Sequence, residues 1–380
     1  MSKKLNLKEF KFLIYGLGRS GQSVVKFFKK KKVSNFSVWD DKQEVRSKFK
    51  KYVTNNLIKS LKEVDYIVLS PGINIIDKIH KKTLYKFKHK ILTDIDLVYL
   101  YNSDFKSIVV TGTNGKSTTC KIIEHLLKNS NFKTKLGGNI GTPILDLDIK
   151  KNIFLVIEAS SFQLSHSKFI KPNYAIFLNF TNDHIDWHGS KNKYLKSKLK
   201  IFHLQDINDY ALINNDLKKI FRKSKFSSIL ITNKRKEYMK LKSKIKNEYL
   251  KSNANDENMN FVFTLAKLLK ITNETFLKSM NTFVGLDHRY EIFFEKRNTI
   301  FINDSKATSL KASELALGGS KNIYWIVGGL PKIHDKINLK EVKQNIIKSY
   351  IIGKHIFFFK NKLKNKIKFQ VSKNLKKAVT

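Results

Sequence analysis

The chain has 380 residues, of which 41% are hydrophobic, and this is enough for two or three domains with a core in each. Its formal net charge of +43 comes almost entirely from lysines scattered through every segment, so we interpret the excess as a solvated surface. A single cysteine, Cys120, excludes an intrachain disulfide framework, and no apolar run reaches the roughly 18 to 20 residues that a membrane span needs. We therefore expect a cytoplasmic protein with no membrane or nucleic-acid partner.

Short apolar runs alternate with polar, helix-compatible stretches over the first hundred residues. Residues 10–30 read as a strand, a glycine turn and a helix, and further strands are predicted at 36–40 and 64–70. Such alternation is typical of parallel strands joined by helices. The first segment is therefore predicted to be α/β.

Two glycine turns follow strands in this segment. Residues 16–21, GLGRSG, have the spacing G-x-G-x-x-G and precede a helix, so backbone N–H groups could face a diphosphate there. Asp40 fits the acidic residue expected about 20 positions further on, and the turn SPG at 70–72 would lie at the same carboxyl edge of the sheet. A plain structural turn is the alternative. The candidate ligand-binding residues are Gly16, Gly18, Ser20, Gly21, Asp40, Ser70, Pro71 and Gly72.

The stretch VVTGTNGKSTT, residues 109–119, joins a predicted strand to a predicted helix and is similar to a phosphate-binding loop. The pattern G-x-x-x-x-G-K-[ST] would need a glycine where this chain has Val110. Lys116 can reach the β and γ phosphates of ATP, the Ser117 hydroxyl can bind Mg²⁺, and the helix N-terminus favours anions. A surface turn with an exposed lysine is the alternative. The candidate nucleotide-binding residues are Gly112, Thr113, Asn114, Gly115, Lys116, Ser117 and Thr118.

Acidic and histidine side chains follow two further apolar runs. Glu158 ends the run FLVIE, and Asp183, His184, Asp186 and His188 come directly after AIFLNF. Because Mg²⁺ prefers oxygen ligands, these strand ends predict a metal site beside the loop. Zinc is the alternative, although the only cysteine lies elsewhere and the spacing is not H-E-x-x-H.

Six motifs occur in the order and approximate spacing of the Mur ligases. They are TGTNGKSTT at 111–119, GGNIGTP at 137–143, EASSFQL at 158–164, NFTNDHIDWHGS at 179–190, GLDHRYE at 285–291 and NDSKATS at 303–309. The chain resembles this family over nearly its whole length. Its GLGRSG, SPGI and DSKAT motifs look specifically like those of the member that adds D-glutamate to UDP-N-acetylmuramoyl-L-alanine in peptidoglycan precursor synthesis.

The resemblance implies three α/β domains: a Rossmann-like domain over 1–100, a central parallel sheet of the P-loop ATPase type over 101–283, and a second Rossmann-like domain over 284–380. It also implies an ATP-dependent amide ligase. In this family ATP converts a carboxylate into an acyl phosphate, which an amine then attacks to give an amide and phosphate. Lys116 and Mg²⁺ would neutralise the negative charge that gathers on the phosphates. We expect the enzyme to be a monomer.

The resemblance also assigns roles in nucleotide and metal binding to residues of the central segment. Lys116 and Ser117 serve the ATP phosphates and the first Mg²⁺, Glu158 is a metal ligand, and His184 matches a ligand of a second Mg²⁺. Lys198 matches a lysine that these ligases carbamylate so that it can bind Mg²⁺. Because only the neutral amine reacts with carbon dioxide, the pKa of Lys198 would have to be lowered.

The resemblance also assigns substrate contacts. The two glycine turns would hold the uridine diphosphate end, and Asn139 matches a residue that contacts the muramoyl group. Arg289 and Asp304 match residues that hold the nucleotide. The positions that match those receiving D-glutamate are Lys306, Thr308 and Lys332.

Two departures from the family pattern affect these expectations. The H-N-x-x-N segment appears at 254–258 as ANDEN, with the histidine replaced. The chain also ends before the family's final segment, which helps to hold D-glutamate, either as a fragment or as a naturally short form. We therefore expect this chain to bind its nucleotides but to add D-glutamate poorly.

Two other functions stay open from the sequence. A folylpolyglutamate synthase would share the central loop but would have no use for the two N-terminal glycine turns. A basic nucleic-acid-binding module would explain the charge, and it predicts a steep loss of affinity with salt.

Overall fold

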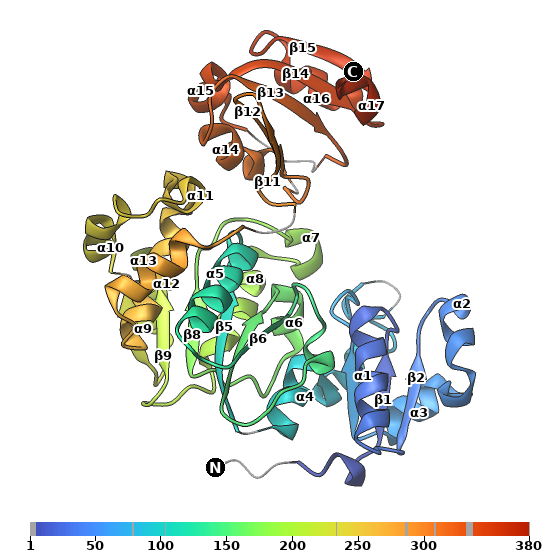
Figure 1. Cartoon of the computed structure of the whole chain (residues 1–380). Helices are drawn as coiled ribbons and strands as arrows, with labels where there is room; N and C mark the ends of the chain where they lie inside the picture. The colour runs from blue at the N-terminus through green and yellow to red at the C-terminus, as the bar shows by residue number, and fades with distance from the viewer. Residues whose placement is uncertain are drawn as a thin grey trace. The chain divides into compact units, whose positions relative to one another are not determined.

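The computed structural model describes residues 5–77, 80–102, 104–232, 234–285, 288–307, 309–331 and 337–379. Contacts divide the chain into a larger unit, Met1–Leu241 with Asn258–Met280, and a smaller unit, Lys242–Glu257 with Asn281–Thr380. Both units combine helices with parallel sheets, so the predicted α/β class is confirmed (Figure 1). The domain boundaries near residues 100 and 284 stay a prediction.

The larger unit begins with a four-stranded parallel sheet. Its strands, in sheet order, are β2 (Phe36–Trp39), β1 (Phe12–Tyr15), β3 (Tyr66–Leu69) and β4 (Ile91–Leu92). The helices of this segment are α1 (Arg19–Lys30), α2 (Gln43–Arg46), α3 (Leu57–Glu63) and α4 (Asp94–Tyr101). Helix α1 buries Gly21, Val24, Val25 and Phe28, which recur at the three- and four-residue spacing of one helix face.

A six-stranded parallel sheet forms the rest of the larger unit. Its strands, in sheet order, are β10 (Ile229–Thr232), β9 (Tyr210–Ile213), β8 (Tyr174–Phe177), β5 (Phe105–Thr111), β7 (Ile153–Glu158) and β6 (Thr134–Gly138). Strands β7 and β8 are buried along their whole length, as parallel strands covered on both faces usually are. The helices are α5 (Lys116–Asn129), α6 (Ser161–His166), α7 (Ile185–His188), α8 (Lys191–Leu199), α9 (Asn215–Lys223), α10 (Arg235–Lys242), α12 (Asp256–Leu268) and α13 (Asn273–Asn281).

A buried carboxylate joins the two sheets of the larger unit. Asp96 on α4 is fully buried, and its Oδ1 accepts hydrogen bonds from Ser167 Oγ at 2.7 Å and from the Lys168 and Phe169 N–H groups at 2.9 and 2.8 Å. One hydrophobic cluster also contains residues of both sheets, among them Ile14 and Val109. These contacts fix the sheets relative to one another.

The smaller unit has its own core. A parallel sheet of order β13-β14-β15 is accompanied by an antiparallel hairpin, and Leu310, Val327, Ile351 and Leu363 are among its buried residues. The strands are β11 (Glu291–Lys296), β12 (Thr299–Asn303), β13 (Ile323–Gly328), β14 (Ile346–Ile352) and β15 (Phe369–Lys373). The helices are α11 (Glu248–Lys251), α14 (Leu310–Gly318), α15 (Leu339–Val342), α16 (Ile356–Leu363) and α17 (Leu375–Val379).

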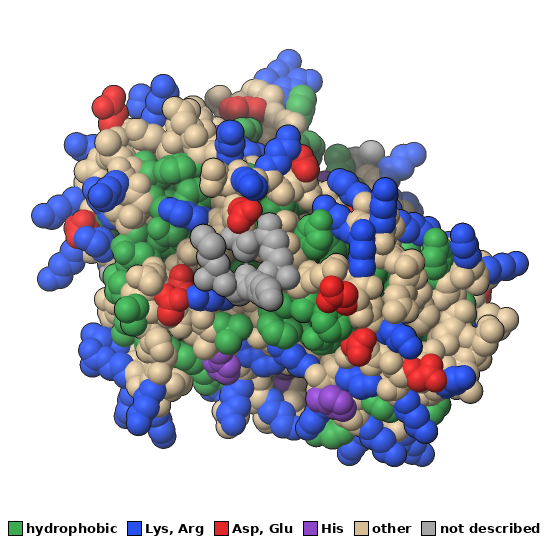
Figure 2. Space-filling view, turned by 90° about the horizontal axis from the view of Figure 1, so that it is seen from below, with side chains coloured by type: hydrophobic (Ala, Val, Ile, Leu, Met, Phe, Trp, Pro, Cys, Tyr) green, Lys and Arg blue, Asp and Glu red, His purple; other side chains and the backbone are tan. Residues whose placement is uncertain are grey.

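The surface reflects the composition. Lys and Arg side chains are spread across the face shown in Figure 2, between hydrophobic and acidic ones, as their even distribution along the sequence suggests. No helix within the described part of the chain is both long and apolar enough to cross a bilayer.

Candidate functional site

The two N-terminal glycine turns pack against each other at the carboxyl edge of the first sheet. Ser70 Oγ donates a hydrogen bond to Gly16 O at 2.8 Å. Gly16 has a φ of +91°, and an added Cβ would lie 2.7 Å from Ser70 Cβ; at Gly21 it would lie 1.9 Å from Gly16 O. Only glycine therefore fits at these two positions. At Gly18 and Gly72 an added Cβ would meet no atom within 4 Å, so packing does not demand glycine there.

Two of the candidate ligand-binding residues, Asp40 and Ser20, form hydrogen bonds within the protein. Asp40 Oδ2 accepts a hydrogen bond from Leu17 N at 2.7 Å, which fixes the backbone of the first turn. Ser20 forms a hydrogen bond with buried Asp94; burial raises the pKa of that carboxyl, although this bond works in the opposite direction. The carboxylate of Asp40 thus orders the loop, and Pro71 lies half-buried in the second turn.

A histidine held between two aspartates was not predicted from the sequence. His80 is 8% exposed, and its ring nitrogens lie 2.8 Å from Asp41 Oδ2 and 2.8 Å from Asp77 Oδ2. Tyr15 donates a hydrogen bond to Asp41 Oδ1 at 2.7 Å. Burial by itself lowers the pKa of His80, but the hydrogen bonds and charges of both carboxylates outweigh it and raise the pKa above its usual value. No motif in the sequence signals this contact.

The predicted phosphate loop connects β5 to α5. Gly115 precedes the helix with a φ of +81°, and an added Cβ there would lie 2.2 Å from Asn258 Oδ1. Lys116 Nζ donates hydrogen bonds to Gly112 O at 2.9 Å and to Thr113 O at 3.0 Å. The strand, loop and helix therefore occur as predicted, with the lysine lying along its own loop.

Two asparagines that sequence reasoning did not select fix this loop. Asn179, after β8, accepts a hydrogen bond from Asn114 N through its side chain at 2.9 Å and one from Thr113 N through its carbonyl at 3.0 Å. Asn258, 6% exposed, accepts a hydrogen bond from Thr119 Oγ1 at 3.2 Å. Asn258 is the last residue of the ANDEN segment, so that segment still contacts the loop although its histidine is replaced.

Glu158 provides a buried carboxylate at the end of β7. It is 1% exposed, and its Oε1 accepts a hydrogen bond from Asn139 Nδ2 at 2.7 Å. Its other oxygen, Oε2, is buried and has no hydrogen-bond partner among the described residues. An unpaired buried carboxylate oxygen is costly, and a divalent cation would satisfy it. Glu158 therefore fits the predicted role of a Mg²⁺ ligand.

Lys198 on α8 is buried against the phosphate loop. It is 1% exposed, and its Nζ donates a hydrogen bond to Gly112 O at 2.7 Å, the same carbonyl that Lys116 contacts. Burial and the charge of Lys116 lower the pKa of Lys198 well below its usual value, and Asp183 and Glu158 only partly oppose this. The site therefore favours the neutral amine that carbamylation requires.

The two histidines of the NDHIDWH motif occupy different environments. His184 is partly exposed, with its Nε2 3.4 Å from Asp183 Oδ2. His188 is 4% exposed; burial and the nearby charges of His184 and Lys198 lower its pKa to about 4, so it is neutral at pH 7. Asp186, on the same short helix, is exposed. His184 is thus the accessible histidine of this motif.

Metal binding at this place would depend on few protein ligands. No group of three or more His, Cys, Asp or Glu side chains in the described ranges is arranged to hold a metal ion. Mg²⁺ commonly keeps several waters and binds one or two carboxylates together with substrate phosphates. Glu158, the Ser117 hydroxyl and a carbamylated Lys198 are compatible with that pattern.

The smaller unit contains the remaining candidate residues. Asp304 Oδ1 accepts a hydrogen bond from Tyr290 N at 3.0 Å, and burial raises the pKa of this carboxyl despite the nearby charge of Arg289. Arg289 Nε is buried and has no hydrogen-bond partner among the described residues. The Lys306 N–H donates to His288 O at 3.0 Å. Thr308 and Lys332 lie outside the described residues.

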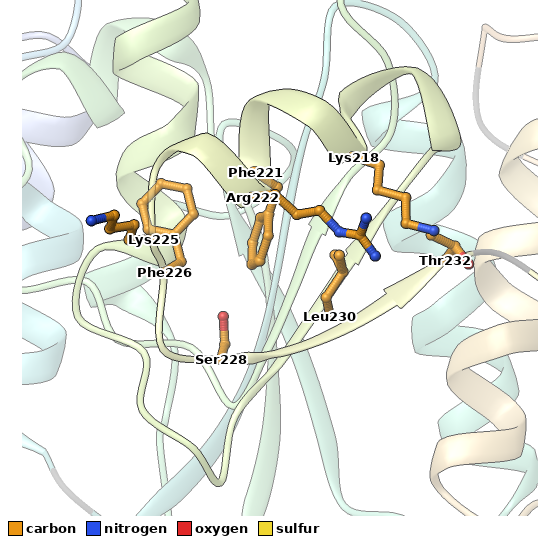
Figure 3. Close-up of a pocket in the computed structure, with 8 residues that line it drawn as sticks. All are labelled: Lys218, Phe221, Arg222, Lys225, Phe226, Ser228, Leu230 and Thr232. Atoms are coloured by element: carbon orange, nitrogen blue, oxygen red, sulfur yellow. The ribbon is translucent and has the colours of Figure 1, made fainter.

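A surface pocket of about 480 Å³ is lined by other residues of the larger unit (Figure 3). It is formed by α9, β10 and the loop between them, and no predicted site residue lines it. Its lining residues are Lys218, Phe221, Arg222, Lys225, Phe226, Ser228, Leu230 and Thr232. The convergence of Lys116, Glu158 and Lys198, rather than this pocket, marks the candidate active site.

Known proteins resemble the chain over most of its length. The family model of the Mur ligase middle domain matches residues 110–324, and the model of the Mur ligase MurD-like N-terminal domain matches residues 10–88. A UDP-N-acetylmuramoylalanine–D-glutamate ligase of Rickettsia prowazekii is 34% identical over 98% of this chain and 88% of the relative. Ligases of the same name from Rickettsia felis and a Wolbachia of Brugia malayi are 33% and 32% identical, each over 96% of this chain and 86% of the relative.

Solved structures share the fold. UDP-N-acetylmuramate-alanine ligase MurC from Thermotoga maritima aligns with a TM-score of 0.56 and 17% identity, over 95% of this chain and 90% of that one. MurF ligase from the same organism, in complex with ADP, aligns with a TM-score of 0.53 and 15% identity, over 96% and 89%. With a family model that matches more than half of the chain and relatives that are more than 30% identical along nearly all of it, this protein belongs to the Mur ligase family.

Proposed function

We propose that this protein is an ATP-dependent ligase that joins D-glutamate to UDP-N-acetylmuramoyl-L-alanine during the synthesis of peptidoglycan precursors. The relatives that carry this activity in their name cover nearly the whole chain. The observation that supports it best is the convergence of Lys116, Lys198 and Glu158 beside a phosphate loop. Both ATP and the nucleotide-linked substrate are metabolites of the cytoplasm, so we propose that the enzyme acts there. We also propose that it acts as a monomer.

The chemistry follows from the weakness of a carboxylate as an electrophile. A substrate carboxylate oxygen attacks the γ-phosphorus of ATP and ADP leaves, which gives an acyl phosphate. The amine of D-glutamate then attacks the carbonyl carbon, phosphate leaves with the electron pair of the broken C–O bond, and the amine loses a proton. Lys116 lies on the loop where the phosphates would bind, and its positive charge would stabilise the negative charge that develops there.

Mg²⁺ would supply further neutralisation of the phosphate oxygens when bound. Glu158 and the Ser117 hydroxyl would hold one ion, and His184 would contribute to a second. Lys198 would bind Mg²⁺ as a carbamate, which forms when its neutral amine attacks carbon dioxide and releases a proton. The lowered pKa of that amine supports this role, because a protonated lysine would repel the ion.

The substrates would use the remaining candidate residues. The turns that contain Gly16, Gly21 and Ser70 would bind the uridine diphosphate end through backbone N–H groups. Asn139, which already contacts Glu158, would meet the muramoyl group. In the smaller unit we assign nucleotide contacts to Arg289 and Asp304. The D-glutamate contacts are assigned to Lys306, Thr308 and Lys332.

Release of phosphate from Mg-ATP tests the proposal directly. The protein is incubated with UDP-N-acetylmuramoyl-L-alanine and with D-glutamate, L-glutamate, L-lysine or no amino acid. We expect release that requires both substrates and selects D-glutamate, and its loss in Lys116→Ala. A tube with a reduced folate in place of the muramoyl substrate serves as the control for the related synthases. Selective turnover of the folate, or equal release with every amino acid, would refute the proposed substrates.

A further inference from the structure

The candidate metal-binding groups stand on separate segments that must be held at a fixed spacing. Glu158 ends β7, and α6 begins three residues later at Ser161. Lys198 lies on α8, directly after Ser197. Both serines are buried, at 3% and 7% exposed. The spacing of Glu158 and Lys198 therefore depends partly on how α6 is held against α8, beside the contact of Lys198 with the phosphate loop.

One imidazole ring adds polar contacts to the direct packing of α6 against α8. His188 Nε2 lies 3.0 Å from Ser161 Oγ, and its Nδ1 lies 3.5 Å from Ser197 Oγ. The ring thus contacts, with its two nitrogens, the residue that starts α6 and the residue beside Lys198. A neutral imidazole has one donor and one acceptor nitrogen, and a serine hydroxyl can complement either.

Aromatic packing fixes the orientation of this ring. Phe162 stacks on His188 with ring centres 5.8 Å apart and an interplanar angle of 6°. The Tyr194 ring lies 5.1 Å away on α8, and its hydroxyl lies 3.2 Å from Thr113 Oγ1 in the phosphate loop. The His188 backbone N–H donates to His184 O at 3.0 Å. The ring therefore sits between α6, α8 and the segment that presents His184.

We propose that His188 is a positioning residue: it holds Glu158 and Lys198 at the spacing needed for one divalent cation and leaves contact with the cation to them. The inference rests on the proposed function, because it assigns both groups to the metal. Partners that orient metal ligands typically change metal affinity by about 10- to 100-fold when they are removed. A residue that served only to fill the core would alter stability instead.

The experiment measures Mn²⁺ binding to the full chain with saturating ADP and bicarbonate, by electron paramagnetic resonance. His188→Phe keeps a stacked ring but removes both hydrogen bonds, and we expect at least tenfold weaker Mn²⁺ binding. ADP affinity in EDTA should stay within twofold of the original. His188→Gln, which can still reach one serine, should recover part of the loss. His125→Gln removes a half-buried histidine that is hydrogen-bonded to Ser279 O, and it serves as the matched control without effect on Mn²⁺.

The paired variant Ser161→Ala with Ser197→Ala tests the same contacts if His188→Phe fails to fold, and it should weaken Mn²⁺ binding to a similar extent. Unchanged Mn²⁺ affinity in either folded variant, or an equal loss in His125→Gln, would overturn the inference. Mn²⁺ binding requires no amino-acid substrate. Weaker Mn²⁺ binding in His188→Phe, together with a wild-type protein that does not discriminate D-glutamate, would thus support the role of His188 and contradict the proposed function.

Discussion

The lowered pKa of Lys198 predicts a specific dependence of stability on pH. In the folded protein the amine is buried and lies near the positive charge of Lys116, so it loses its proton well below the usual pKa. Between that lowered pKa and about 10.4, the unfolded chain binds more protons than the folded protein. The free energy of unfolding therefore rises with pH in this window. Below the window the full cost of burying the charge is present, and above it the cost disappears.

Replacing Lys198 with methionine removes the titrating group and keeps a long side chain. For an unfolded-state pKa of about 10.4 and a folded amine that is already neutral, the linkage relation gives a change of about 1.2 kcal/mol between pH 9 and pH 10. The free energy of unfolding of the wild type should gain this amount relative to Lys198→Met. The variant should also lack ligase activity while remaining folded.

Urea unfolding followed by Trp187 fluorescence would measure the difference, after Trp39 and Trp325 are both replaced with phenylalanine. Buffers must be free of bicarbonate so that the amine is unmodified. Lys196→Met, which removes an exposed lysine from the same helix, is the control. A difference between wild type and Lys198→Met that stays constant within about 0.3 kcal/mol from pH 9 to pH 10 would refute a lowered pKa.

Three further substitutions test the site and the first sheet. Gly115→Ala places a side chain at a residue with positive φ and against Asn258, so it should lower the free energy of unfolding by about 1 to 3 kcal/mol. It should also weaken ADP binding, as measured by calorimetry. An unchanged free energy of unfolding and an unchanged ADP affinity would contradict the backbone geometry at Gly115. Glu158→Gln keeps the size of the side chain and a hydrogen-bond acceptor for Asn139 but loses the negative charge. The Mg²⁺ concentration for half-maximal phosphate release should therefore rise about tenfold or more. An unchanged Mg²⁺ dependence would show that Glu158 is not a metal ligand. The pKa of His80 is raised in the folded protein, so protonated His80 stabilises the fold fully below the unfolded-state pKa near 6.5, and this stabilisation is lost as the pH rises through the folded-state pKa. His80→Gln should therefore lower the melting temperature more at pH 6 than at pH 9. The reverse order would show that the flanking aspartates do not raise the pKa of His80.

Local patterns in the sequence were enough to predict the parallel α/β fold and to select residues that meet at one edge of the central sheet. The order of strand, loop and helix around Lys116 and the glutamate at the end of an apolar run are local features. The carboxyl ends of parallel strands meet at one edge of a sheet, so residues that follow β5, β7 and β8 must come together there. The glycines at 16 and 21 were predictable for a similar reason, because a tight turn between strand and helix excludes a Cβ.

The chemical state of the site was decided by contacts between distant segments. Three parts of the chain meet at the site. Lys198 is buried, Lys116 contacts the same carbonyl, and one oxygen of Glu158 has no hydrogen-bond partner among the described residues. The same holds for Asn258, which contacts a loop more than a hundred positions earlier, and for His80 between its two aspartates. A pKa and a hydrogen bond depend on the dielectric surroundings and on neighbouring charges, and these exist only after the chain has folded. The sequence by itself therefore determined which groups occur at the edge of the sheet, whereas the tertiary structure decided their protonation and their partners.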